Sequence, residues 1–341
     1  MRNALTATVV SALSLLVGCG GDDDTSGSTT STHGTSTDTG STTDTTTGVG
    51  GGTTTGSTTD GGGGAGTGGS APTNNGFPPH WNDGTSCASE PDVQVWEYAE
   101  DTYILRQSLC ANFEGPFLYL FLGDDKALLE DTGTGDVDLA TVVQVLVDQW
   151  AAKKGKTIEL VVAHSHGHGD HVGGDGQFAG MPNTTVVPKS TSGVQGFFGI
   201  ANWPTQLVTF DLGNRVLDVI PIPGHQSAHI AFYDRRHDLL LTGDTLYPGR
   251  LYINDWSQYR ASTQRLVDFV GAGNPVTWVL GTHIEMTVQP GDDYPMGADQ
   301  HPNEHVLQLA PASLDELNQA VQAMGATPSL EVHDDFIVYP L

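Results

Sequence analysis

Basic side chains are scarce in this chain. Its 341 residues include 13 Lys and Arg against 40 Asp and Glu, which gives a formal net charge of −27 at pH 7. Nucleic acids and anionic lipids carry dense negative charge, so this imbalance argues against both as binding partners. It also disfavours a substrate with several negative charges, unless a local patch around Arg235, Arg236 or Arg250 overrides the mean charge. We expect a small-molecule substrate, and the oligomeric state stays open.

The apolar stretch near the N-terminus is too short to span a membrane. Residues 4–17 fall below the roughly 20 apolar residues that a transmembrane helix needs. The stretch follows Arg2 and ends in the letters LVGC at Cys19, which resembles a bacterial lipoprotein signal. The resemblance implies cleavage before Cys19 and attachment of lipid to its thiol. We therefore expect residues 1–18 to be a signal peptide, with an ordinary secretory signal as the alternative.

Residues 19–76 lack aromatic side chains and contain very few aliphatic ones. They are almost wholly Gly, Ser, Thr and Asp. Such a segment cannot bury enough apolar surface to offset the entropy lost on ordering, so it should form a disordered, flexible tether. By the square-root rule for Gly-rich chains, its r.m.s. span is about 40 Å. The exported protein would then be lipid-anchored to the cell envelope, facing the periplasm or the cell surface, while an O-glycosylated stalk remains possible.

Cysteine is rare as well, since the chain has three. Apart from Cys19, only Cys87 and Cys110 remain. Neither belongs to the cluster of candidate metal ligands described below. In an exported chain an even pair is more often a disulfide than two free thiols, so we expect Cys87 and Cys110 to be linked.

The densest cluster of chemically active residues lies at positions 164–171, which read HSHGHGDH. Four histidines and one carboxylate follow the apolar run 158–163 directly. Neutral imidazole nitrogens and carboxylate oxygens are ligands that suit zinc and iron. The order His166-x-His168-x-Asp170-His171 supplies ligands for two metal ions from a single loop.

Three further candidate ligands recur downstream in the same setting. His225, Asp244 and His283 each lie just beyond a short apolar run, at 216–220, 239–241 and 276–280. A glycine lies one or two positions before each of them. A strand that ends in a tight turn presents a side chain at the rim of a sheet, so the repeated pattern predicts a metal site there.

The order of these candidate ligands resembles that of the metallo-β-lactamase superfamily of metallohydrolases. The resemblance covers roughly residues 93–341. The resemblance implies a four-layered αβ/βα sandwich with two metals at one edge of the sheets. It assigns three groups of ligands: one metal at His166, His168 and His225, a second at Asp170, His171 and His283, and Asp244 as the bridge. The expected cofactor is two zinc ions per chain, with iron or manganese possible.

The chemistry expected of such a centre follows from charge. Two divalent cations a few ångströms apart lower the pKa of a trapped water from about 16 to about 7, and the resulting hydroxide is a nucleophile. Asp170 and Asp244 are the expected catalytic carboxylates, because Asp170 can also orient the hydroxide. Metal-bound histidines usually donate their other ring proton to an acceptor, and Asp131 is the candidate for that role.

Several residues near the motif have weaker assignments. His164 lies outside the ligand spacing and is expected to support the site rather than bind metal. His229 is interpreted as structural, with substrate contact as the alternative. Tyr247 either contacts the substrate, as in quorum-quenching lactonases, or packs as a rim aromatic. His301 and His305 are interpreted as surface residues, with a place at the mouth of the pocket as the alternative.

Asp244 also narrows the expected activity. Most metallo-β-lactamases carry Cys or Ser at this position, whereas residues 243–247 (GDTLY) resemble the turn of glyoxalase II. The aspartate at position 244 favours the glyoxalase II and lactonase branch of the superfamily. The expected reaction is therefore hydrolysis of an ester, thioester or lactone-type bond. A mononuclear-iron persulfide dioxygenase, a β-lactam hydrolase and a non-catalytic metal-binding protein remain alternatives.

The remaining pattern is that of one α/β domain at 77–341. Residues 117–122 and 126–130 are predicted strands around a Gly-Asp-Asp turn. Apolar residues at helical spacing predict a helix over 137–152. Two more helices are expected at 257–270 and 313–324, and a closing strand at 336–339. Alternation of strands and helices favours the α/β class.

Overall fold

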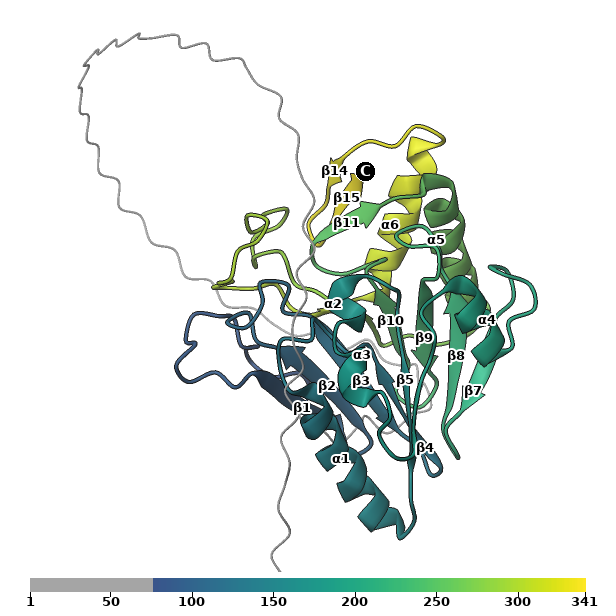
Figure 1. Cartoon of the computed structure of the whole chain (residues 1–341). Coiled ribbons are helices and arrows are strands. Elements are labelled where there is room, and N and C mark those ends of the chain that lie inside the picture. Colours follow the sequence, from purple (N-terminus) through teal and green to yellow (C-terminus); the bar gives the residue numbers. More distant parts are fainter. Residues whose placement is uncertain (1–75) are drawn as a thin grey trace, which may run out of the picture. The chain divides into compact units, whose positions relative to one another are not determined.

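The computed structural model describes residues 76–341, which form three β-sheets and six helices. The expected signal peptide, the acceptor Cys19 and the tether up to residue 75 lie outside the described residues. The first sheet has the order β1-β2-β3-β4-β5-β6, and the second has the order β13-β12-β10-β9-β8-β7. A third sheet of three short strands has the order β11-β15-β14. Figure 1 shows the two large sheets packed against each other, with the third sheet close to the C-terminus.

The strands of the first sheet are β1 (Val93–Ala99), β2 (Thr102–Gln107), β3 (Phe117–Leu122), β4 (Lys126–Glu130), β5 (Glu159–Ala163) and β6 (Thr184–Val186). Those of the second are β7 (Val208–Asp211), β8 (Val216–Pro221), β9 (Ile230–Asp234), β10 (Leu239–Gly243), β12 (Trp278–Gly281) and β13 (Gln308–Leu309). The third sheet contains β11 (Arg250–Ile253), β14 (Glu331–Val332) and β15 (Ile337–Pro340). The helices are α1 (Leu139–Lys154), α2 (Gly169–Val172), α3 (Asp175–Phe178), α4 (Thr191–Phe198), α5 (Trp256–Gly271) and α6 (Pro311–Met324).

Both faces of each large sheet are covered, so apolar side chains alternate between two cores. On β3, Phe117 and Phe121 point into the core between the two sheets, where they join residues of β8 and β9 such as Val219 and Phe232. Leu120 lies between them in sequence and packs on the other side, against the α1 core. The period-2 geometry of a strand produces this division.

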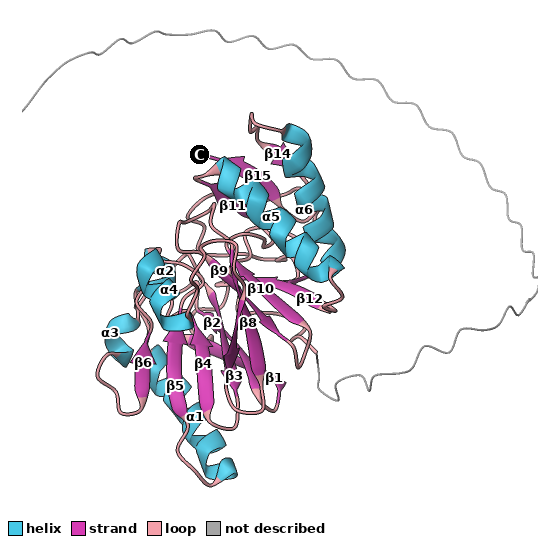
Figure 2. Ribbon diagram, turned by 90° about the vertical axis from the view of Figure 1, so that its right-hand side faces the viewer, coloured by secondary structure: helices cyan, strands magenta, loops and turns pink. Residues whose placement is uncertain are grey.

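The outer layers are helical. Buried residues of α1, including Val143 and Val147, pack on the outer face of the first sheet. Buried residues of α5 and α6, including Leu266 and Leu317, pack on the second. Figure 2 shows α1 and the α5–α6 pair on opposite sides of the sheets. The expected four-layered αβ/βα sandwich is confirmed.

The helix boundaries differ slightly from the predicted ones because side chains cap the ends. α1 begins at Leu139 rather than at 137, since the Asp138 carboxylate accepts a hydrogen bond from the Thr141 N–H at 3.2 Å. It continues to Lys154 and ends at Gly155, which adopts a left-handed conformation. Asp255 caps α5 in the same way through the Gln258 N–H.

The segment before β1 is held by a covalent link. Cys87 and Cys110 form the expected disulfide, with their Cα atoms 5.5 Å apart. Cys87 lies ahead of β1 and Cys110 follows β2, so the link joins the first hairpin to the loop that precedes it. Among the helices of residues 76–341, none combines the length and apolar character needed to cross a membrane.

Candidate metal centre

The first candidate ligands lie where β5 ends. β5 pairs in parallel with β4, and both strands run out at the same edge of the first sheet. His166 and His168 occupy the loop after Ala163, and Asp170 and His171 lie on the single helical turn α2. His168 takes the N-cap position of that turn in an extended conformation. Because the chain changes from an extended loop to a helical turn at His168, all four candidate ligands of this short motif can face the same centre.

The other ligands come from the matching edge of the second sheet. His225, Asp244 and His283 follow β8, β10 and β12, of which β10 and β12 are parallel. The glycines before them are required by close packing. A Cβ atom on Gly224 would lie 2.5 Å from the Tyr259 Cα, and one on Gly243 would lie 2.6 Å from the His229 Nε2. Gly243 also has a φ of +50°, which favours glycine.

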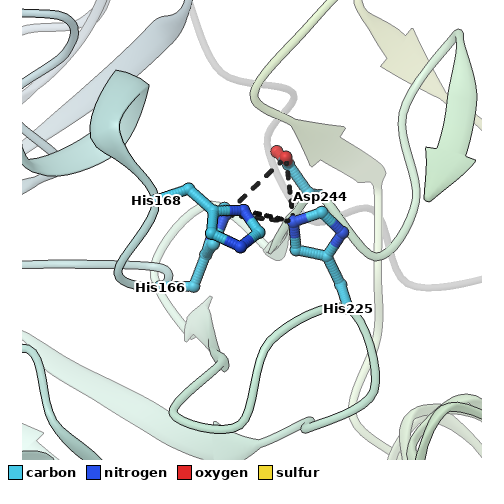
Figure 3. Close-up of side chains that lie close together, drawn as sticks. All are labelled: His166, His168, His225 and Asp244. Carbon is cyan, nitrogen blue, oxygen red and sulfur yellow. Dashed lines mark hydrogen bonds and ion pairs between the residues drawn. The ribbon is translucent and has the colours of Figure 1, made fainter. Parts of the chain in front are cut away.

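Four residues converge as the first ligand group: His166, His168, His225 and Asp244. The His168 Nδ1 lies 2.9 Å from the Nε2 of both His166 and His225, and these two Nε2 atoms are 3.1 Å apart. The Asp244 Oδ2 is 3.4 Å from the His225 Nε2 and 3.7 Å from the His166 Nε2. Figure 3 shows all four side chains pointing toward a common centre.

A second group lies beside the first and shares one member with it: Asp170, His171, Asp244 and His283. The Asp170 Oδ2 is 3.1 Å from the His171 Nε2 and 3.3 Å from the His283 Nε2. The Asp244 Oδ1 is 3.4 Å from the first of these nitrogens and 3.5 Å from the second. Asp244 therefore turns one carboxylate oxygen to each group, and the Thr282 hydroxyl donates a hydrogen bond to Oδ1.

The outer ring nitrogens of these histidines are held by acceptors. The His225 Nδ1 donates to the Tyr252 carbonyl at 2.6 Å, and the His283 Nδ1 donates to the Glu114 carbonyl at 3.0 Å. The His171 Nδ1 donates to the Asp131 Oδ2 at 2.8 Å. In a neutral ring each Nε2 then carries a lone pair, as a metal ligand requires.

Asp131 organises the motif from behind. It follows β4 with a φ of +68°, and its Oδ1 accepts the Ser165 N–H at 2.8 Å. Its Oδ2 also accepts the Ser165 hydroxyl at 2.7 Å. The Ser165 oxygen lies 3.1 Å from the His166 Nδ1, so one carboxylate orients the rings of His166 and His171 together.

The donor set fits metal ions. Nitrogens bound to one zinc in a tetrahedral site are about 3.3 Å apart, close to the spacing within the first group. Within residues 76–341 the buried His171 Nε2 has no hydrogen-bond partner, although two carboxylates lie beside it. Lone pairs and carboxylate oxygens that face each other across 3–4 Å repel unless a cation lies between them. Each group can therefore hold one cation, and Asp244 can touch both.

The charge state of the side chains agrees with this. Burial lowers the pKa of His166 and His225, so both rings are neutral at pH 7. Burial would raise the pKa of Asp244, but His171 and His283 hold it well below its usual value. Burial opposes the proton on His283, yet Asp244 and Asp170 raise its pKa to about 9. A bound cation would replace the charge of that proton.

Three further expected site residues lie around the centre. His164 belongs to neither ligand group, and its Nε2 is 3.2 Å from the Asp175 Oδ1. His229 is fully buried against the His166 ring, with ring centroids 4.8 Å apart. Tyr247 is buried beside the His283 ring, and its hydroxyl donates to the Arg250 carbonyl. Tyr247 also borders the cavity in front of the centre.

A cavity of about 250 Å³ opens in front of the centre. Its lining includes the candidate ligands Asp170, Asp244 and His283 and two further carboxylates, Glu114 and Glu285. The two glutamates have no sequence signal that marks them as site residues.

The prediction that His301 is a surface residue is wrong. His301 is 5% exposed, and its ring stacks on that of Tyr294 with the ring centroids 4.2 Å apart.

Comparison with known proteins matches residues 112–283, half of the chain, to the model of the metallo-beta-lactamase superfamily. The human acyl-coenzyme A thioesterase MBLAC2 is 25% identical over 214 residues, covering 54% of this chain and 75% of that protein. The hydroxyacylglutathione hydrolase of Methylococcus capsulatus is 33% identical over 108 residues, covering 31% of this chain and 42% of that enzyme.

Among solved structures, a metallo-beta-lactamase from Pontibacter korlensis superposes with a TM-score of 0.45 at 17% identity, over 67% of this chain and 99% of that one. The structure of TMB-1 gives a TM-score of 0.46 at 14% identity, over 69% and 99% of the two chains. The family match spans both ligand groups, from the loop before β3 to His283. The chain belongs to the metallo-beta-lactamase superfamily.

Proposed function

We propose that this superfamily member is a dinuclear-metal hydrolase that cleaves an ester, thioester or lactone-type bond. The observation that carries the proposal is the Asp244 carboxylate, which turns one oxygen to each of two ligand groups. A purely structural site would need only four ligands in a closed shell. Seven ligands shared between two cations, beside an open cavity, would leave coordination positions for a water and a substrate oxygen.

Each residue has a defined role in this proposal. The first metal would be held by His166, His168 and His225, and the second by Asp170, His171 and His283, with Asp244 shared. Zinc is the expected metal, with iron or manganese possible, because the set contains only imidazole and carboxylate ligands. When bound, two such cations lower the pKa of a water molecule and polarise the oxygen of the scissile bond.

The side chains around the metals orient the reactants. Asp170 lines the cavity, so its carboxylate can accept a hydrogen bond from the attacking water and direct the water's lone pair at the substrate carbonyl. Asp131 and Ser165 keep the rings of His171 and His166 aimed at the centre. The names of the thioesterase and hydroxyacylglutathione hydrolase relatives support an ester or thioester as the substrate.

The test combines metal analysis with a panel of substrates. Purified protein should contain up to two metals per chain and hydrolyse at least one ester, thioester or lactone. The panel should also contain β-lactams and phosphodiesters. If the protein hydrolyses only one of these two classes, it is a hydrolase of another type than proposed. If the fully metallated protein hydrolyses nothing but consumes oxygen with a persulfide once loaded with iron, the dioxygenase alternative replaces the proposal.

A further inference from the structure

The cavity in front of the metal centre borders two further cavities. It shares Glu114, Tyr252 and Glu285 with a neighbouring cavity of about 320 Å³. It shares His225 and Asn254 with another of about 410 Å³. A substrate whose scissile bond lies at the metals would therefore extend one arm into each neighbouring cavity. The side chains of these cavities decide which arms are accepted.

Apart from the metal site itself, lysine and arginine side chains are scarce along this path. In the described part of the chain, Arg250 is the one Lys or Arg that lines any of the three cavities. Its guanidinium is 9% exposed and is already committed to neighbours. It donates to the Tyr252 hydroxyl at 3.0 Å, to the Tyr294 carbonyl at 2.9 Å and to the Asp293 carboxylate. Arg250 therefore has little capacity left to bind an anionic substrate.

The other two arginines considered as a local basic patch are also committed. Arg235 donates to the Asp218 carboxylate at 2.7 and 2.6 Å, and Arg236 donates to Asp101. Neither lines the three cavities. The strongly acidic composition of the chain is thus not reversed locally at the centre.

Negative charge, by contrast, borders the path. Glu285 lies at the junction of two cavities, where its Oε2 accepts the Arg250 N–H at 2.8 Å and lies 3.8 Å from the Arg250 Nε, so its charge is partly offset by that guanidinium. Glu114 lies at the same junction, and its half-buried carboxylate forms no hydrogen bond or ion pair within residues 76–341. Beyond the metal ligands themselves, a substrate therefore meets two carboxylates near the reacting bond.

The walls beyond the glutamates differ on the two sides. The 320 Å³ cavity is bordered by Phe113, Ile284 and Met296, and the Phe113 and Met296 side chains are 45% and 71% exposed. Such exposed apolar groups can cover an apolar substituent. The 410 Å³ cavity is bordered by Trp203 and by uncharged polar side chains such as Gln226, with Asp255 as its only acidic member in the described chain.

We propose that this centre selects uncharged or cationic esters and thioesters and rejects anionic ones. The selection is carried chiefly by the Glu114 carboxylate, with the paired Glu285 beside it and an apolar group of the substrate against Phe113 and Met296. This inference rests on the proposed hydrolase function and names its substrate class. It implies that the leaving groups named for the relatives, coenzyme A with its phosphates and glutathione with its carboxylates, are poorly accepted here.

The test is a set of thioesters with one acyl chain and leaving groups of different charge. N-acetylcysteamine supplies the neutral member, thiocholine the cationic one, and glutathione and coenzyme A the anionic ones. With the zinc-loaded protein, kcat/KM for the neutral and cationic members should exceed that for the anionic members at least about tenfold, because like charges brought together disfavour binding. Non-hydrolysable thioether analogues should show the same order of affinity by calorimetry with the protein as purified.

Glu114→Gln provides the matched variant, because it keeps the shape of the side chain and removes the charge. The ratio of kcat/KM between the cationic and anionic members should fall about tenfold, mainly through KM. Glu97→Gln is the control, since Glu97 is exposed on β1 and lines none of the three cavities; its ratio should equal that of the wild type. Using a ratio within one variant cancels differences in metal loading.

The outcomes separate the two proposals. If the anionic thioesters are hydrolysed as fast as the neutral one, or if Glu114→Gln leaves the ratio unchanged, the selection by charge is wrong while the hydrolase function stands. If none of the thioesters and no ester or lactone of the broader panel is hydrolysed, the proposed function fails, and this inference fails with it.

Discussion

At the scale of single residues, Asp244 is the most sensitive position, because it is the one side chain shared by the two ligand groups. Asp244→Ala should lower the metal content from up to two ions per chain to one or fewer. It should also reduce kcat by more than the roughly 10–100-fold loss typical of residues that only orient a ligand. Inductively coupled plasma mass spectrometry and initial rates measure both effects. Asp148→Ala, on the exposed face of α1, should change neither, and full metal content in Asp244→Ala would contradict the bridging role.

His164 and His166 provide a second comparison at this scale. The Nε2 of His166 lies 3.1 Å from that of His225, whereas the His164 Nε2 lies beside Asp175 instead. His166→Ala should therefore empty the first site, while His164→Ala should retain most of the metal. Metal content after dialysis against a weak chelator measures the difference. Equal losses in the two variants would mean that the assignment of ligands within the motif is shifted by two residues.

At the scale of secondary-structure elements, Asp101 connects the two large sheets. It lies in the turn between β1 and β2, and its Oδ1 is 3.5 Å from the guanidinium of Arg215, which precedes β8. Arg215 also forms an ion pair with Asp234 of β9 at 2.6 Å. Burial would raise the pKa of Asp101, but hydrogen bonds from His237 and Arg236 and the charge of Arg215 hold it well below its ordinary value of 3.8.

A carboxyl whose pKa is lowered by folding stabilises the protein at pH values above its unfolded pKa, and that contribution is lost as the pH falls toward the folded value. Asp101→Asn should therefore lower the free energy of unfolding by about 1.5–3 kcal/mol at pH 7. The difference from wild type should shrink below pH 3.8. Urea titrations at several pH values measure it, with the exposed Asp148→Asn as the control. A difference that persists unchanged at pH 2 would show that the ion pairs are not its source.

At the scale of the whole molecule, we propose that the protein is exported and anchored to the cell envelope through Cys19. Cys19→Ser should block lipidation and shift the protein from the membrane fraction to the soluble fraction or to an unprocessed precursor. Detergent fractionation and the mass of the N-terminal peptide measure this. Cys87→Ser is a useful comparison, because it removes the disulfide with Cys110 but leaves the lipid acceptor. If Cys19→Ser still fractionates with membranes as the wild type does, the anchor lies elsewhere.

The sequence alone determined the class of the fold and the set of candidate ligands. Apolar runs that end just before His225, Asp244 and His283 already indicated strands that deliver side chains to one rim. The helix over 137–152 was predicted to within two residues at each end, because apolar spacing is a local property. The motif from His166 to His171 needs only a short loop and one helical turn to bring its ligands together.

Only the tertiary structure decided the surroundings of that site, because those contacts join residues far apart in the chain. It turned the Tyr247 hydroxyl to the Arg250 carbonyl and buried His301 under Tyr294, neither of which local pattern predicts. The tertiary structure also places hydrogen-bond acceptors around the Arg250 guanidinium. It brings Glu114 and Glu285 to the same cavity. Charge in a binding site depends on which groups remain unpaired after folding, and composition cannot supply that information.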